Sequence, residues 1–301
     1  MWEKRWFQFA ILLLLAFIWG SSFILIKVGL RSFSNEQAAV IRIFLASVAL
    51  IPFAVKNRKY FKRKDLKSLL IAGFIGSFFP AFLFTKAQTQ IDSALAGILN
   101  SLTPVFTLVI GILFHRSKVK IRQLIGLFLG LTGAVGLVAT GSGLTGITIN
   151  YYALYIVLAT LMYGVNINEV KSHLTHLTGI QITSFSFMFI GPAAFIYMLT
   201  LDFSQVADSP GWGWHLLALA ALAVVGTSFA LLLMNSLIRY TSAIFASSVT
   251  YIIPVFAILW GILDHEKIGV ADIVFMVIIL VGVYLINRQK KKKRENVGER
   301  S

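Results

Sequence analysis

The sequence predicts an all-α polytopic membrane protein with ten transmembrane helices, arranged as two inverted five-helix repeats. Two observations lead to this prediction: the composition is far more apolar than that of a soluble domain, and one set of motifs occurs twice. Of the 301 residues, 57% are hydrophobic and 13% are charged, whereas soluble domains are about 45–50% apolar and about 25% charged. A chain of this composition is expected to lie mostly within a bilayer.

The repeated motif is clearest around two prolines. The segment Pro104–Phe106 returns as Pro254–Phe256, 150 positions later, and Trp19 followed by glycine returns as Tyr163 followed by glycine, 144 positions later. Many membrane carriers are built from two related halves, which give one fold an inward-open and an outward-open state. The duplication therefore favours transport more strongly than any single residue does.

The apolar runs place the individual helices. Each span needs about 20 apolar residues, and the connections should carry glycine, proline and charged residues. The spans are expected at 7–30, 36–55, 68–86, 94–114, 121–140, 151–169, 180–201, 215–238, 243–263 and 270–287. The first repeat then covers residues 1–140 and the second covers 151–287, and residues 288–301 form a basic cytoplasmic tail.

The distribution of positive charge sets the orientation. With the N-terminus in the cytoplasm, 22 of the 27 lysines and arginines fall on the cytoplasmic side and 3 on the other side. Cytoplasmic loops carry such an excess, so both termini are expected in the cytoplasm of a bacterial inner membrane. Because five spans are an odd number, the second repeat enters the membrane inverted. The net charge of +15 is explained by this topology, and no nucleic acid partner is expected.

A family resemblance rests on Trp19–Phe23 with Lys27, Arg42, Ser93–Ala96, Pro104–Phe106, Ser242-Ala243, Pro254–Phe256 and Gly282–Leu285. In these residues, their order and their spacing, the chain resembles the drug/metabolite transporter superfamily, and specifically its EamA-type ten-helix exporters. The resemblance implies two inverted bundles around a central cavity and export of amino acids, related metabolites or drugs. One departure is His115-Arg116, which stands where the family usually has an acidic residue after helix 4.

Helices 4 and 9 carry polar residues at helical spacing: Ser93, Asn100 and Thr107 on helix 4, and Ser247, Thr250 and Tyr251 on helix 9. Asn100 on helix 4, and Thr250 and Tyr251 on helix 9, are expected to face each other across the cavity and bind substrate, because a polar solute needs replacements for its water contacts. The alternative is helix packing, in which small polar side chains bond their own backbone. Pro104 and Pro254 are expected to kink these two helices and shape the cavity.

Helices 1, 2 and 6 supply the other candidates. Trp19 and Ser22 occupy the same turn of helix 1 that Tyr163 and Asn166 occupy on helix 6, so the aromatic rings could wall the substrate and the polar groups could bind it. Arg42 lies about a turn inside helix 2, where a cation suggests a functional site and could meet a substrate carboxylate. The alternatives are bundle packing for Trp19, and snorkelling or an ion pair with Glu36 for Arg42.

The residue inventory excludes several chemistries. Cysteine is absent, which excludes disulfides and thiolate metal sites, and no metal, cofactor or nucleotide motif is present. No acidic pair lies at depth, so an enzyme is not expected. All twelve acidic residues fall at span ends or in loops. Coupling would therefore use an end residue such as Glu36, Asp92 or Glu169, or the protein would be a facilitator or exchanger.

The sequence thus predicts a membrane transporter that exports a small metabolite, such as an amino acid or a drug-like amphipath, by alternating access. The alternative is a flippase of similar fold for a lipid-linked substrate. The expected partners are the small-molecule substrate and the lipid bilayer. The glycines at 126, 130 and 133 form a close-packing face, used either within the chain or between the protomers of a homodimer.

Overall fold

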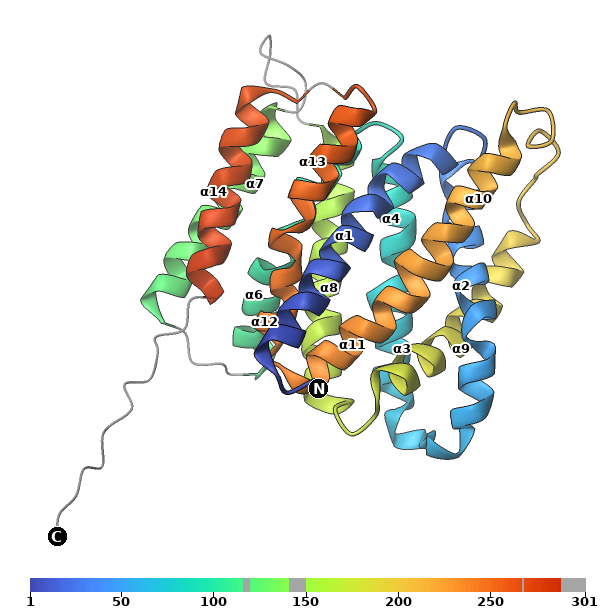
Figure 1. Cartoon of the computed structure of the whole chain (residues 1–301), viewed down its shortest axis with the longest axis horizontal. Helices are drawn as coiled ribbons and strands as arrows, with labels where there is room; N and C mark the ends of the chain where they lie inside the picture. Colours follow the sequence, from blue (N-terminus) through green and yellow to red (C-terminus); the bar gives the residue numbers. More distant parts are fainter. Residues whose placement is uncertain (116–119, 141–149, 267, 288–301) are drawn as a thin grey trace.

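The computed structural model describes residues 1–115, 120–140, 150–266 and 268–287, and all regular structure within them is helical (Figure 1). In these ranges, eight helical segments are long and apolar enough to cross a membrane, and two shorter apolar helices cover Ile121–Gly133 and Val270–Gly282. The predicted class of all-α polytopic membrane protein is confirmed. Arg116 and the basic tail 288–301 lie outside the described residues.

The helical elements follow the predicted spans closely. The first half contains α1 (Arg5–Gly29), α2 (Asn35–Asn57), η1 (Arg58–Tyr60), η2 (Arg63–Asp65), α3 (Leu66–Gly73), η3 (Phe74–Phe78), α4 (Phe79–Ala87), α5 (Ser93–Asn100), α6 (Thr103–His115) and α7 (Ile121–Thr140). The second half contains α8 (Tyr151–His173), α9 (Gly179–Met198), α10 (Trp212–Ala223), η4 (Val224–Phe229), α11 (Ala230–Tyr240), α12 (Ala243–Ser247), η5 (Ser248–Tyr251), α13 (Ile253–Leu263) and α14 (Val270–Asn287).

Matching helices in the two halves begin in the same way. Ser34 caps α2 and Thr178 caps α9, and each forms a reciprocal capping box with a glutamine three residues later. The side-chain oxygen of the cap accepts a free backbone N–H, while the glutamine returns a bond to the cap. The two caps lie 144 positions apart, the same offset that relates Trp19 to Tyr163.

Two spans contain a π-helical turn. The turn η3 separates α3 from α4, and η4 separates α10 from α11, 150 positions later. In η4 the hydroxyl of Thr227 donates to the Leu222 carbonyl five residues back, which satisfies a backbone acceptor in the widened turn. Such turns are rare and often mark functional sites, and sequence periodicity did not predict them.

Spans 4 and 9 are broken rather than simply kinked. Ser101 and Leu102 separate α5 from α6, and the 3-10 turn η5 separates α12 from α13. Pro254 lies in the first turn of α13, where a missing N–H leaves no intrahelical bond unmade. Each proline thus follows the break and begins a new helix.

The two halves interlock through glycines. A Cβ added to Gly20 in α1 would lie 2.5 Å from the Phe256 Cβ in α13, and one added to Gly164 in α8 would lie 2.8 Å from the backbone of Phe106 in α6. Helices α1 and α8 therefore pack almost directly on the backbone of the opposite half. The two contacts occupy equivalent places in the repeat.

Helices α7 and α14 pair at one edge of the bundle, on the left in Figure 1. A Cβ on Gly133 would lie 2.7 Å from Ile279, and one on Gly282 would lie 2.6 Å from the Gly126 carbonyl. The predicted glycine face is thus occupied within the chain. Helix α1 begins and α14 ends on the same side of the molecule.

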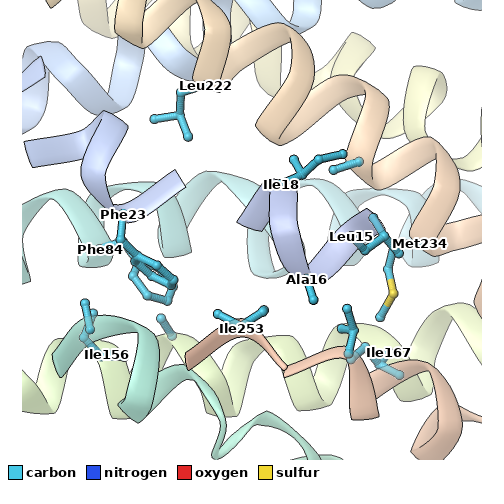
Figure 2. Packing of buried hydrophobic residues seen from close by; sticks show 14 of the residues in the cluster. Leu15, Ala16, Ile18, Phe23, Phe84, Ile156, Ile167, Leu222, Met234 and Ile253 are labelled. Carbon is cyan, nitrogen blue, oxygen red and sulfur yellow. The ribbon is translucent and has the colours of Figure 1, made fainter. Parts of the chain in front are cut away.

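Large apolar side chains close the bundle around its centre (Figure 2). Phe23 from α1 lies beside Phe84 from α4, with ring centroids 5.8 Å apart. Both rings are buried. Their contact joins two spans at the wall of the central cavity, which is described in the next subsection.

Candidate functional site

A cavity of about 90 Å³ lies between the two halves. It is large enough for several water molecules, and it is lined by residues from α1, α2, α4, α5, α6, α8, α11, α12 and the turns η3, η4 and η5. No lining residue comes from α9. The lining residues are Trp19, Ser22, Phe23, Ile26, Arg42, Gly76, Ser77, Phe84, Asn100, Thr103, Tyr163, Asn166, Ile167, Gly226, Thr227, Leu231, Met234, Asn235, Ile238, Ser247, Val249 and Thr250.

Seven of the eight predicted binding residues line this cavity, and Tyr251 does not. Tyr251 ends η5 and packs partly buried against the apolar core. A 3-10 residue turns the chain by about 120° and an α-helical residue by about 100°. The four residues of η5 therefore rotate Tyr251 by roughly 80° from the position that a regular helix predicts.

Arg42 reaches the cavity from the second turn of α2. Its Nε donates to the Thr227 hydroxyl at 2.8 Å, and no carboxylate of the described residues forms a salt bridge with it. The predicted alternative, an ion pair with Glu36, is absent among the described residues. A guanidinium offers five donors, so the two terminal nitrogens remain available to a ligand.

Two amide oxygens in the cavity wall have no hydrogen-bond partner. These are the Oδ1 atoms of Asn100, at the end of α5, and Asn166, in α8, and the two residues are 6% and 9% exposed. A buried acceptor without a donor costs about 1–3 kcal/mol. Water or a ligand that donates hydrogen bonds would remove this cost.

At two equivalent places in the cavity wall, a polar side chain of one half lies against a glycine of the other half. Ser22 lies against Gly226, because a Cβ there would lie 2.9 Å from its hydroxyl, and Asn166 lies against Gly76, because a Cβ there would lie 2.5 Å from its amide. Trp19 also donates from Nε1 to the Gly226 carbonyl at 3.0 Å. The two π turns thus place the backbone beside the polar groups of helices α1 and α8.

The wall also contains residues that the sequence analysis did not single out, among them Phe84, Thr227 and Asn235. Tyr163 stacks on Phe84, with ring centroids 5.9 Å apart. Thr227 positions Arg42 across a sequence separation of 185 residues. Asn235 lines the cavity and donates to Thr183 at 2.9 Å. The one sequence signal for Thr227 was its alignment, after glycine, with Ser77 in the first half.

Other members of the predicted polar stripe have structural roles. The Ser93 hydroxyl accepts from Gln88 at 3.2 Å, and the Thr107 hydroxyl donates to the Thr103 carbonyl at 2.8 Å. Thr250 lines the cavity, but its hydroxyl donates to the Ser247 carbonyl at 2.9 Å. The packing interpretation therefore applies to Ser93 and Thr107.

An ion cluster lies beyond the end of the cavity nearest Phe23. Lys27 contacts Asp264 at 2.8 Å and Glu266 at 2.7 Å, and Asp92 lies 3.9 Å away. The hydrogen bond from Lys27 lowers the pKa of Asp264, and burial raises the pKa of Asp92. Among the described residues, no group of three or more histidines and carboxylates is arranged to hold a metal ion.

Comparison with known proteins assigns the chain to a family. The EamA-like transporter family matches residues 6–139 and again residues 150–288. The "Uncharacterized inner membrane transporter YedA" of Escherichia coli is 27% identical over 291 residues, which cover 92% of each chain. An "Uncharacterized transporter" of Archaeoglobus fulgidus is 25% identical over 95% of this chain and 100% of that protein.

A further relative carries a more specific name. The "Probable terminal-alkyne amino-acid exporter" of Streptantibioticus cattleyicolor is 25% identical over 66% of each chain. A solved structure titled "Crystal structure of protein" shares the fold, with a TM-score of 0.65 at 14% identity over 94% of this chain and 97% of that chain. With the family matched twice along nearly its whole length, the chain is a member of the EamA-like transporter family, a multi-pass membrane transporter.

Proposed function

We propose that this transporter exports a small solute that carries both a carboxylate and an amino group, such as an amino acid, through the central cavity. The observation that carries the proposal is Arg42, a half-buried cation that lines the cavity and forms no salt bridge with a carboxylate of the described residues. A substrate carboxylate would accept a bidentate bond from this guanidinium.

The remaining polar groups suit the amino end of such a solute. Asn100 and Asn166 offer unpartnered oxygens, which accept the N–H donors of an ammonium group. Trp19, Phe84 and Tyr163 supply an aromatic wall for an apolar side chain. The name of the amino-acid exporter from Streptantibioticus cattleyicolor supports the same substrate class.

The proposed mechanism is alternating access between two inverted repeats, residues 1–140 and 151–287, with both termini in the cytoplasm. Support comes from contacts that recur at equivalent places in the two halves, such as Gly20 on α13 and Gly164 on α6. Inverted halves have two nearly equal arrangements, and exchange between them opens the cavity to one side and then to the other. The broken spans 4 and 9 resemble the discontinuous helices that form binding sites in other carriers.

Counterflow in proteoliposomes tests the proposal. Vesicles loaded with unlabelled amino acids should accumulate a labelled amino acid, but not the amine that lacks its carboxylate. Arg42→Gln should weaken apparent affinity by roughly 10- to 100-fold, since a hydrogen bond to a charged group is worth about 1.5–3 kcal/mol. Arg42→Lys should retain part of the activity. Arg58→Gln changes an exposed arginine at the start of η1 and should leave counterflow unchanged.

Two results would overturn the proposal. Equal counterflow of the amino acid and of the amine that lacks its carboxylate would show that Arg42 does not bind a substrate carboxylate. Failure with every soluble amino acid would exclude the substrate class and leave the lipid-linked substrate as the explanation to pursue.

A further inference from the structure

The carboxylate of Glu266 joins three elements at one end of the cavity. It follows α13 and accepts hydrogen bonds from Lys27 of α1 at 2.7 Å, and from the backbone N–H groups of Ser93 and Ala94 at 3.0 Å each. Its side chain is 1% exposed. Glu266 therefore caps the first turn of α5 from the opposite half of the chain while it neutralises Lys27.

A second layer lies between this ion cluster and the cavity. Gln88, which follows α4, donates from Nε2 to the Phe23 carbonyl of α1 at 2.9 Å and to the Ser93 hydroxyl of α5 at 3.2 Å. Below it, the rings of Phe23 and Phe84 meet and line the cavity. Helices α1, α4 and α5 are thus tied together at this end.

Close packing surrounds the same cluster. A Cβ on Gly97 of α5 would lie 2.3 Å from the Ala257 Cβ of α13, and one on Gly261 would lie 2.6 Å from the Glu266 carboxylate and 3.1 Å from Ala94. Without side chains at these glycines, α13 lies directly against α5. Opening this end therefore requires α13 to leave both α1 and α5.

The opposite end of the bundle lacks the equivalent ion pair among the described residues. Lys171, the repeat counterpart of Lys27, donates to the carbonyls of Ile238 and Arg239 at the end of α11, at 3.1 and 3.3 Å. The start of α12, the counterpart of α5, is capped by its own Ser242, which accepts from the Phe245 N–H. The sequence at the counterpart of Glu266 is basic, His115-Arg116.

We infer that Lys27 and Glu266 form a latch that keeps the outer end of the cavity closed, and that the asymmetry between the two ends makes this closed arrangement the resting state. The inference rests on the proposed transport function and on cytoplasmic termini, which place Lys27 on the outer side. In an exporter, this resting state leaves the empty cavity accessible to substrate from the cytoplasm.

The energetic basis is the burial of the glutamate. If α1 moves away from the α13–α14 connection, the ion pair between Lys27 and Glu266 is lost. If α5 moves away, the Glu266 carboxylate loses its two backbone N–H donors. Unpairing a buried charge is far more costly than breaking an exposed ion pair. Substitution of either partner should therefore shift the population toward an outward-open state.

Cysteine accessibility tests the latch, since the chain contains no cysteine. Ser22→Cys places one thiol in the cavity wall as a reporter. A small, charged, membrane-impermeant thiol reagent is added to intact cells or to inside-out vesicles. The parent reporter should react faster from the cytoplasmic face. Lys27→Met and Glu266→Gln should each raise the rate of reaction from outside by about tenfold, which corresponds to about 1.4 kcal/mol.

Two comparisons sharpen the result. The double variant should raise the outside rate by less than the product of the two single effects, because each single variant already breaks the shared Lys27–Glu266 contact. Asp208→Asn removes an exposed acidic residue from the loop before α10 and should change nothing. Lys27→Met leaves the cap on α5 intact, so it remains informative if Glu266→Gln folds poorly.

Faster labelling of the parent from outside, or unchanged outside labelling in both latch variants, would overturn the inference. The readout does not depend on which solute is carried. A failure of amino-acid counterflow would therefore contradict the proposed substrate class without deciding the latch, and the labelling result would decide the latch by itself.

Discussion

Replacing Gly164 by alanine should destabilise the protein through the contact between α8 and α6. The new Cβ would lie 2.8 Å from the Phe106 carbonyl carbon and 2.9 Å from the Thr107 nitrogen, whereas ordinary contacts begin near 3.4 Å. The helices would have to separate by about 0.6 Å. The obstructing atoms are backbone, so side-chain rotation cannot relieve the clash.

The cost can be estimated from two contributions. Overpacking a well-packed interface costs about 1–3 kcal/mol. The separation also stretches the bond from Asn168 to the Thr107 carbonyl, now 2.9 Å, and a hydrogen bond contributes about 1 kcal/mol. We therefore expect a loss of about 2–4 kcal/mol. Gly213→Ala is the matched control, because nothing lies within 4 Å of its Cβ and alanine favours the helix by up to about 1 kcal/mol.

Thermal unfolding of the purified protein in detergent, followed by tryptophan fluorescence, measures both variants. By the scale for large soluble domains, about 2–4 °C per kcal/mol, Gly164→Ala should lower Tm by at least about 4 °C. Gly213→Ala should leave Tm unchanged or slightly higher. An unchanged Tm for Gly164→Ala would refute the inference that the halves meet backbone to backbone at this position.

Three further predictions concern individual contacts. Thr227→Val should remove the hydrogen bond that holds the Arg42 guanidinium and raise the apparent KM for counterflow several-fold. Thr227→Ser keeps the hydroxyl and should retain the wild-type KM. Equal KM values for the two variants would show that the hydroxyl does not position Arg42. Trp19→Phe keeps the aromatic wall but removes the bond to the η4 carbonyl, so it should cost about 1 kcal/mol in unfolding free energy, and a loss of 3 kcal/mol or more would assign the ring a larger packing role. Because Lys27 lowers the pKa of Asp264 below its ordinary 3.8, the ionised carboxylate stabilises the fold above pH 3.8 and loses this contribution as pH falls through its lowered pKa. Asp264→Asn should therefore lower Tm at neutral pH by an amount that shrinks below pH 3.8, and a difference that grows in acid would contradict this assignment.

The spans could be predicted from sequence because apolar runs and their breakers are local signals. Each of the ten predicted ranges corresponds to one observed helix or interrupted helix. The cavity residues Trp19, Asn166 and Arg42 could also be predicted, since a repeated position or a polar group at depth is visible in the chain itself.

The other features of the site could not be predicted, because they depend on irregular turns and tertiary contacts that sequence periodicity does not reveal. The 3-10 turn η5 rotates Tyr251 away from the cavity, and the π turn η4 brings Thr227 to Arg42. The bonds of Glu266 to α5 join positions more than 170 residues apart. Such contacts follow from tertiary packing, so a hydropathy pattern cannot specify them.

The most direct test of the central claim is an experimental structure of the transporter with an amino acid bound. The account predicts the ligand in the central cavity, with its carboxylate within about 3 Å of the Arg42 terminal nitrogens and its ammonium group toward Asn100 or Asn166. A ligand bound with its carboxylate directed away from Arg42, or bound outside this cavity, would contradict the account.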